Sequence, residues 1–110
     1  MITSPTVDDF VVAVESLIGT RIVHRGRSRN GIDCVGVPIV ALRSLGLDAE
    51  EPKSYGVIPD ADLLTGYLRK CCRLVAFEDR RAGDLLQVRV GNQGRHLAVI
   101  TGVESDTQSV

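Results

Sequence analysis

The chain has 110 residues, of which 44% are hydrophobic, and its 13 basic and 14 acidic residues give a formal charge of −1. A chain of this length builds one hydrophobic core, so we expect a single domain over residues 1–110. The near-zero net charge excludes a general attraction to nucleic acid or to an anionic membrane.

Neither a signal peptide nor a membrane span is visible in the sequence. Residues 1–19 lack a basic n-region, and no apolar run approaches the roughly 20 residues that cross a bilayer. The three cysteines are irregularly spaced, and a bond between the adjacent Cys71 and Cys72 would be strained. We therefore expect free thiols, synthesis in a cytoplasm and a reducing compartment. With no Cys-x-x-Cys pair and only two histidines, we expect no metal site.

The first predicted element is an amphipathic helix. Residues 4–9 (SPTVDD) are typical of a helix start, with a capping hydroxyl, a proline in the first turn and acids near the positive helix end. Apolar residues then recur on one face until Gly19: Phe10, Val11, Val14, Leu17 and Ile18. Residues 20–31 (TRIVHRGRSRNG) are basic and glycine-punctuated, so we expect a loop with at most a short extended piece at residues 21–23.

A second helix is expected to begin at Asp33 or Cys34 and to end at Gly46. The predicted buried side comprises Val37, Val40, Ala41 and Leu45. If Asp33 is the N-cap, Pro38 falls at the fifth helical position, where it disturbs the first turn by about 3 kcal/mol. Either the turn is distorted or the regular helix begins later.

A third helix and a β-hairpin complete the predicted elements. The helix follows a loop at residues 48–59, with Asp60 as its cap and helical spacing at Leu63, Leu64, Tyr67, Leu68, Cys71 and Cys72. This pattern gives both cysteines a role as small core residues. Two β-type runs, residues 85–90 and 96–101, flank the turn residues 91–94. Because the helices precede the strands, we expect an α+β domain rather than a wound parallel sheet.

Cys34 is the first candidate for chemistry. At a helix start, the positive helix end and free backbone N–H groups would favour its thiolate. A nucleophile also needs a base, which only His24, in the basic loop, and His96, opening an apolar run, can supply. The alternatives are that Cys34 is an inert core residue and that His96 is a satisfied strand-edge histidine. The residues alone leave both readings open.

Several short motifs occur in an order known from one peptidase family. They are Gly19-Thr20, residues 24–29 (HRGRSR), residues 31–36 (GIDCVG), residues 45–47 (LGL), Gly83-Asp84 and residues 96–100 (HLAVI). As an ordered set over about residues 11–102, they resemble the NlpC/P60 cysteine peptidases, and among these the phage-encoded, tail-associated cell-wall peptidases. Each piece alone would be a weak signal, whereas the ordered set is fairly specific.

The resemblance implies a papain-like α+β core in which N-terminal helices, one of them bearing Cys34, pack on a small antiparallel sheet. It implies that Cys34 is the nucleophile and His96 the general acid and base. The substrate class would be the stem peptides of bacterial peptidoglycan, cleaved beside a γ-linked D-glutamyl unit. No cofactor, metal, nucleic acid or membrane would take part. The protein would belong to a virion tail or a prophage, with other tail proteins as further partners.

Three features depart from the family pattern. One is Pro38, which stands where the family usually has an unbroken apolar helix. Ile22 stands where many relatives have a tyrosine near the thiol. The residue that orients the histidine usually lies on the next strand, and the sequence ends at Val110, so the resemblance allows a C-terminally truncated core. Gln108 has about the right offset from His96 to be this orienting residue; the alternative is a solvated amide in a polar tail.

The basic loop offers a candidate substrate clamp. The guanidinium groups of Arg25, Arg27 and Arg29 could bind the free carboxylates of a stem peptide. The alternative is a charged loop that faces water. Asp33 is a further candidate for substrate binding, although a helix cap is its simpler role. Asp84 is expected to close a turn before the first strand.

Three functions therefore remain open. The first is a cysteine peptidase that acts on peptidoglycan. The second is a structural or assembly protein of the tail that keeps the fold without a complete site. The third is thiol acyl transfer or amide hydrolysis on another substrate. A sulfur and an imidazole on opposite sides of the domain would exclude the first and the third.

Overall fold

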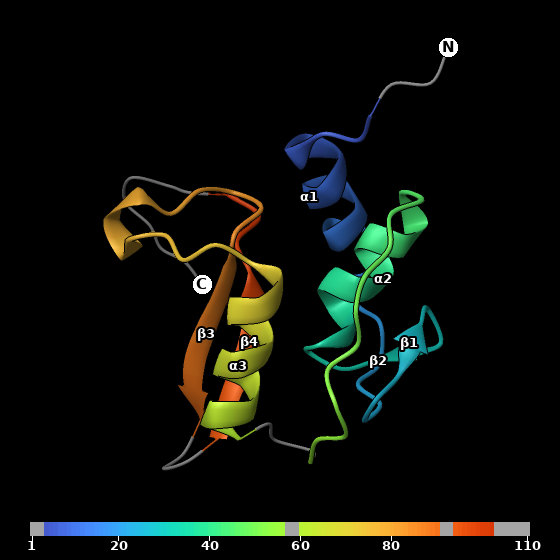
Figure 1. The fold of residues 1–110 in the computed structure, drawn as a ribbon. Helices are drawn as coiled ribbons and strands as arrows, with labels where there is room; N and C mark the ends of the chain where they lie inside the picture. The colour runs from blue at the N-terminus through green and yellow to red at the C-terminus, as the bar shows by residue number, and fades with distance from the viewer. Residues whose placement is uncertain (1–3, 57–59, 91–93, 103–110) are drawn as a thin grey trace.

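The structure is a computed structural model that describes residues 4–56, 60–90 and 94–102. Its helices are α1 Val7–Glu15, α2 Gly36–Ser44 and α3 Ala61–Cys71, with a short 3₁₀ helix η1 at Phe77–Asp79. Its strands are β1 Arg27–Ser28, β2 Gly31–Ile32, β3 Leu85–Val90 and β4 Gly94–Val99. Within the described ranges the strands form two antiparallel pairs, β1 with β2 and β3 with β4 (Figure 1). The predicted α+β class is confirmed, while the papain-like architecture stays a prediction.

Helix α1 begins behind a capping box with Thr6 as its N-cap. A capped helix start was predicted here, but Pro5 lies before the helix and not in its first turn. The hydroxyl of Thr6 accepts the backbone N–H of Asp9 at 3.1 Å, and the carboxylate of Asp9 accepts the N–H of Thr6 at 2.9 Å. Three of the predicted apolar positions are buried: Val11, Val14 and Leu17. Ile18 is 79% exposed, which the helical pattern did not predict, because the regular helix has already ended at Glu15.

The basic segment after α1 contains a small hairpin that was not predicted from the sequence. Arg27 lies opposite Ile32 and Ser28 opposite Gly31, and Ile22 adds a single parallel bridge to Ile32. Strands of two residues leave no readable alternation of apolar and polar residues. The hairpin brings the basic residues back against the turn that carries the candidate nucleophile.

Helix α2 begins at Gly36, later than Asp33 or Cys34, and Pro38 explains why. The N–H of Val37 still donates to the carbonyl of Asp33 at 3.2 Å. Pro38, however, has no N–H to offer the carbonyl of Cys34, so the helical hydrogen-bond series is interrupted there. Pro38 then falls in the first turn of the regular helix, where a missing N–H is tolerated. Two outcomes were expected for this helix start, a distorted first turn or a regular helix that begins later. The structure has the regular helix that begins later.

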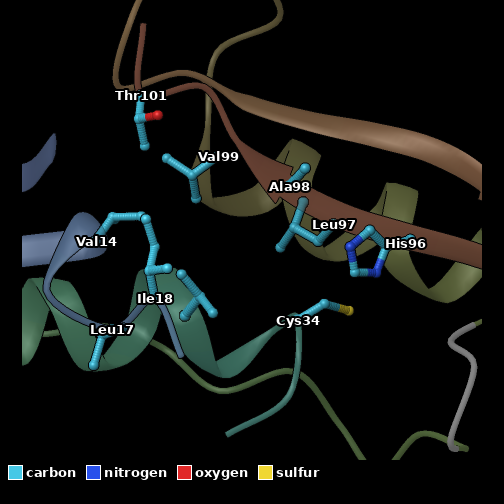
Figure 2. Close-up of a pocket in the computed structure, with 10 residues that line it drawn as sticks. Val14, Leu17, Ile18, Cys34, His96, Leu97, Ala98, Val99 and Thr101 are labelled. Carbon is cyan, nitrogen blue, oxygen red and sulfur yellow. The ribbon is translucent and has the colours of Figure 1, made fainter. Parts of the chain in front are cut away.

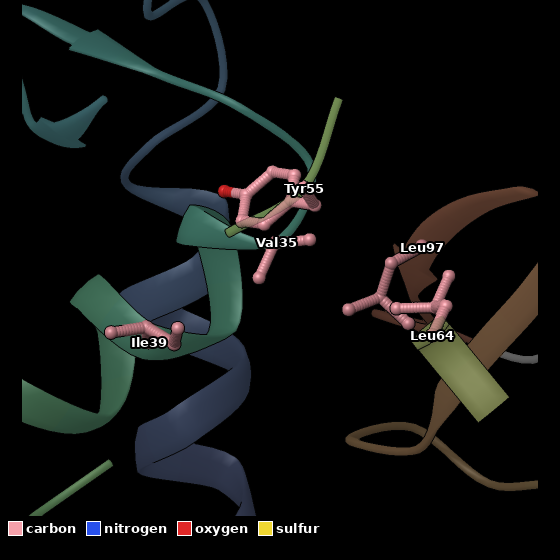
Figure 3. Packing of buried hydrophobic residues seen from close by; sticks show 5 residues of the cluster. All are labelled: Val35, Ile39, Tyr55, Leu64 and Leu97. Carbon is pink, nitrogen blue, oxygen red and sulfur yellow. The ribbon is translucent and has the colours of Figure 1, made fainter. Parts of the chain in front are cut away.

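Two hydrophobic clusters hold the elements together. The first comprises Val35, Ile39, Tyr55, Leu64 and Leu97, and it joins α2 and the turn before it to α3 and β4 (Figure 3). The second comprises Val14, Leu17, Ile32 and Ala41, and it joins α1 to α2 and β2. Full burial of an aliphatic side chain contributes about 1.5–3 kcal/mol. The first cluster therefore fixes the Cys34 turn against β4.

The buried face of α2 differs from the predicted one, and the helix also ends earlier, at Ser44. Ala41 is buried as predicted, and Ile39 is buried although it was not predicted. The other three predicted positions are only partly buried: Val37, Val40 and Leu45. Because each residue advances a helix by about 100°, Ile39 lies on a different side of the helix from Val37, and the packing of neighbouring elements decides which side is buried.

Helix α3 confirms the third predicted helix. The carboxylate of its N-cap, Asp60, accepts the backbone N–H groups of Asp62 and Leu63, each at 3.3 Å. Cys71 and Cys72 are both exposed, so the core role predicted for them is wrong. The reason is that the core contacts of α3 end one turn earlier, at Leu68. No helix within the described ranges combines the length and the apolar character that a membrane crossing requires.

The predicted β-hairpin is confirmed, with both bounds of its second strand changed, from residues 96–101 to Gly94–Val99. Strand β3 has the predicted bounds, but β4 begins at Gly94, so His96 lies opposite Val88 within the strand and does not open it. Asp84 closes the turn before β3 as expected, since its carboxylate accepts the backbone N–H of Arg81 at 2.8 Å. Helix α3 lies against this hairpin, and α1 and α2 lie beside each other on the other side of the domain (Figure 1).

Candidate functional site

Cys34 and His96 line the same cavity, which has a volume of about 320 Å³ (Figure 2). The other lining residues come from α1 and the turn after it, from α2, and from β4 with its continuation: Val14, Leu17, Ile18, Val37, Leu97, Ala98, Val99 and Thr101. In Figure 2 the sulfur of Cys34 and the imidazole of His96 lie together at one end of the cavity. The arrangement that would have excluded nucleophilic catalysis, with the two groups on opposite sides of the domain, is not observed.

The sequence places each of the two groups through simple local rules. Neighbouring residues of a strand point to opposite faces, so the burial of Leu97 in the core turns His96 outward. Cys34 precedes α2 in the turn that Val35 anchors in the core. The pair therefore combines a half-buried thiol with an exposed imidazole.

The pKa of the Cys34 thiol is raised above its ordinary value of 9.0. Burial is the largest cause, and the nearby carboxylate of Asp33 raises the pKa further. The backbone N–H groups of Leu97, Val35 and Cys34 itself act in the opposite direction but do not compensate. The expectation that the helix start favours the thiolate is therefore wrong in its net sign, because desolvation outweighs the amide dipoles. The thiol keeps its proton at neutral pH until a base removes it.

Two backbone amides beside the sulfur are free to bind negative charge. Within the described part of the chain, the N–H groups of Cys34 and Val35 donate to no backbone oxygen, and both favour negative charge on the sulfur. Neither N–H has the helical carbonyl partner four residues earlier, because both residues lie before the first turn of α2. Amides in this position can hold the oxyanion that forms when a thiol attacks a carbonyl.

Asp33 fixes the Cys34 turn through four hydrogen bonds to its carboxylate. The donors are the backbone N–H groups of Arg25 and Gly36, at 2.8 and 2.9 Å, the Nη1 of Arg27 at 2.9 Å and the hydroxyl of Tyr55 at 2.6 Å. Burial alone would raise the pKa of this carboxyl, but the hydrogen bonds and the charge of Arg27 lower it below its ordinary 3.8. Asp33 is not the N-cap of α2, which is Val35 and has no side-chain cap bond; the bond from Gly36 instead lets Asp33 close the turn that precedes the helix. Its role in substrate binding stays a prediction.

Arg27 lies at the centre of an ion-pair network behind the turn. Its guanidinium pairs with Asp33 and with Glu51, each at 2.9 Å, and also donates to the hydroxyl of Tyr55 at 2.7 Å. Glu51 in turn pairs with Arg43 at 3.2 Å. In this network each partly buried charge is paired with a charge of opposite sign. The ion pairs connect the basic hairpin, the Cys34 turn and the segment after α2.

The other two arginines of the predicted clamp also have partners inside the protein. Arg25 donates to the hydroxyl of Ser54 at 3.0 Å and lies over the ring of Tyr55, 5.6 Å from its centroid. Arg29 donates to the backbone oxygen and the hydroxyl of Ser16, each at 3.1 Å. Binding of substrate carboxylates by Arg25, Arg27 and Arg29 stays a prediction, and it would have to compete with these internal bonds.

The remaining site predictions concern His24 and Gln108. His24 packs edge-on against Tyr55, with the ring centroids 5.5 Å apart, and it is not among the residues that line the cavity. Gln108 lies outside the described residues. Apart from Cys34 and Thr101, the described lining of the cavity offers the His96 imidazole no polar side chain. The orienting role of Gln108 therefore stays a prediction.

Tyr55 and Glu51 were not identified from the sequence. Both lie in the polar segment 48–59, which carries no periodicity. One weak signal was available, since Tyr55 is one of only two tyrosines in the chain and stands alone as an aromatic residue in a polar segment. A buried tyrosine needs a partner for its hydroxyl, which here is the carboxylate beside the thiol.

Comparison with known proteins adds no family. No family model matches the sequence, and no curated protein or solved structure shows a significant similarity to it. The NlpC/P60 resemblance therefore stays a prediction that rests on the ordered motifs in the sequence.

Proposed function

We propose that this chain is a cysteine peptidase that hydrolyses peptide bonds in peptidoglycan stem peptides, in the setting of a phage tail. The observation that carries the proposal is that Cys34 and His96, sixty-two positions apart in the sequence, line one cavity. The free amides of Cys34 and Val35 beside the sulfur support the same chemistry. The substrate class and the phage setting come from the sequence motifs alone.

The reaction would proceed in two stages. His96 takes the proton from the Cys34 thiol as the sulfur attacks the peptide carbonyl carbon, and the amides of Cys34 and Val35 stabilise the oxyanion. His96 then gives the proton to the leaving amine, the C–N bond breaks, and a thioester remains on Cys34. In the second stage His96 takes a proton from water, the resulting attack releases the carboxylic acid, and the thiol is restored. Because burial raises the thiol pKa, the sulfur needs His96 as a base to become a nucleophile.

The two other functions each have an observation in their favour. A tail structural protein without activity is favoured by the raised pKa of Cys34 and by the internal partners of the arginines of the predicted clamp. Acyl transfer or amide hydrolysis on another substrate is favoured by the mainly apolar lining of the cavity. Both alternatives keep the same fold, so activity measurements distinguish them.

The test is incubation with purified peptidoglycan and, in parallel, with a γ-D-glutamyl stem peptide. We expect new amino termini to appear with the wild-type chain and not with Cys34→Ala. Release no greater than that of Cys34→Ala on both substrates would favour the structural function. A panel of thioesters and amides that acylate Cys34 in the absence of stem-peptide cleavage would favour the third.

A further inference from the structure

The wall of the cavity that β4 provides is a strand edge with no neighbouring strand among residues 4–56, 60–90 and 94–102. The N–H of Ile100 donates to the carbonyl of Asp84 at 2.9 Å, so the backbone of Ile100 is directed toward β3. Residues that bond toward the partner alternate along an antiparallel strand with residues that bond away from it. Leu97, Val99 and Thr101 therefore direct their N–H and C=O groups away from β3. All three residues line the cavity.

One end of this strand edge lies beside Cys34, the candidate nucleophile. Several backbone groups along the edge can still accept or donate a hydrogen bond. The backbone N–H of Leu97 is directed at the sulfur of Cys34, where it favours the thiolate. Within the described ranges, the C=O of Leu97 and both backbone groups of Val99 have no backbone partner outside the hairpin. Such an edge is a template on which an extended chain adds as a further strand.

The opposite wall of the cavity is apolar. It is formed by Val14, Leu17 and Ile18 (Figure 2), together with Val37 from α2. Ile18 is 79% exposed, and it lines the cavity. A cavity of about 320 Å³ is at the small end of the range of ligand pockets, about 300–1,000 Å³. It therefore fits a short segment with an uncharged side chain.

We propose that the cavity binds an extended peptide segment as a strand added to the edge of β4, with an apolar side chain against Ile18 and its neighbours. This inference rests on the proposed function and narrows its substrate class. The residue next to the bond that Cys34 attacks is apolar, and the charged γ-glutamyl carboxylate lies outside the cavity. The backbone of the segment pairs with Leu97 and Val99.

The test measures binding separately from cleavage. The wild-type chain is alkylated with iodoacetamide in the presence of millimolar acetyl-Ala-Val-Ala-amide, and mass spectrometry of the Cys34-containing fragment gives the rate at that thiol. We expect the peptide to slow alkylation. Two analogues should need at least about fivefold higher concentrations for the same effect: one with N-methylated backbone amides, which cannot pair, and one with Glu in place of Val.

Two variants of exposed aliphatic residues complete the design. Ile18→Glu should weaken protection by the apolar peptide about fivefold or more, because it puts a charge into the apolar wall. Val12→Glu is the matched control, since Val12 on α1 is 63% exposed and is not among the residues that line the cavity, and it should leave protection unchanged. Ile18→Glu costs little stability, because its side chain is already mostly in solvent.

The outcomes separate the two proposals. Absence of protection, or equal protection by the N-methylated peptide, overturns pairing with β4. Equal protection by the glutamate peptide overturns the apolar specificity. Cleavage of peptidoglycan without protection overturns this inference alone, whereas protection without cleavage of peptidoglycan or the stem peptide overturns the peptidase alone.

Discussion

Replacing Tyr55 with Phe removes one hydroxyl and leaves the aromatic ring in the core. That hydroxyl donates to Asp33 at 2.6 Å and accepts from Arg27 at 2.7 Å. A hydrogen bond to a charged group contributes about 1.5–3 kcal/mol. Asp33 keeps three other donors and Arg27 keeps Glu51, so neither charge is left without a partner. We expect the free energy of unfolding to fall by about 2–3 kcal/mol, one strong bond and part of a second.

Urea denaturation, monitored by circular dichroism, measures this change. We expect a lower midpoint urea concentration and an unchanged dependence of the free energy of unfolding on urea concentration. The other tyrosine supplies the control, because the hydroxyl of Tyr67 donates only to the neutral backbone oxygen of Glu50, at 2.6 Å. Tyr67→Phe should cost about 0.5–1.5 kcal/mol. Equal losses for Tyr55→Phe and Tyr67→Phe would refute the argument that the charged network stabilises the Cys34 turn.

Three further predictions concern the same turn and the end of α3. Asp33→Asn should lower the urea midpoint near pH 7, and the difference from wild type should shrink as the pH falls from 3.8 through the lower folded pKa, because a carboxyl with a lowered folded pKa stabilises the fold fully only above its ordinary value. Gly36→Ala should lower the free energy of unfolding by about 1–3 kcal/mol, since its Cβ would lie 2.6 Å from a carbonyl oxygen. Gly66→Ala, with nothing within 4 Å on α3, should instead raise it by about 0.5–1 kcal/mol, and thermal melts of the pair compare the two. A thiol-specific chromogenic reagent should label the exposed Cys71 and Cys72 before the half-buried third thiol; the opposite order would contradict the fold.

The elements that could be predicted from the sequence are those whose signals are local. Helix α3 has its cap at Asp60 and its apolar spacing within one stretch, and the β3–β4 hairpin has its turn residues between two apolar runs. The β1–β2 hairpin could not be predicted, because each of its strands has only two residues, too few to show a pattern. The exposure of Cys71 and Cys72 depends on where the core ends, and helical spacing does not carry that information.

The candidate site also has features that could be predicted from the sequence and features that could not. Cys34 and His96 could be selected because the chain has few thiols and imidazoles, and their common cavity agrees with that selection. The sign of the Cys34 pKa shift could not be predicted, since burial depends on the whole fold while the helix start is a local feature. The hydrogen bond between Tyr55 and Asp33 could not be predicted either, because the two residues are 22 positions apart and Tyr55 lies in a polar segment without periodicity.

The most direct test of the Cys34–His96 centre is covalent trapping, followed by intact-protein mass spectrometry. The protein is mixed with a thioester of a γ-D-glutamyl peptide, and the acylated residue is then mapped. We expect one acyl group on Cys34, none in Cys34→Ala at that position, and acylation of His96→Ala slower by about 100-fold or more. An adduct confined to Cys71 and Cys72, or acylation of Cys34 at the same rate without His96, would contradict the account.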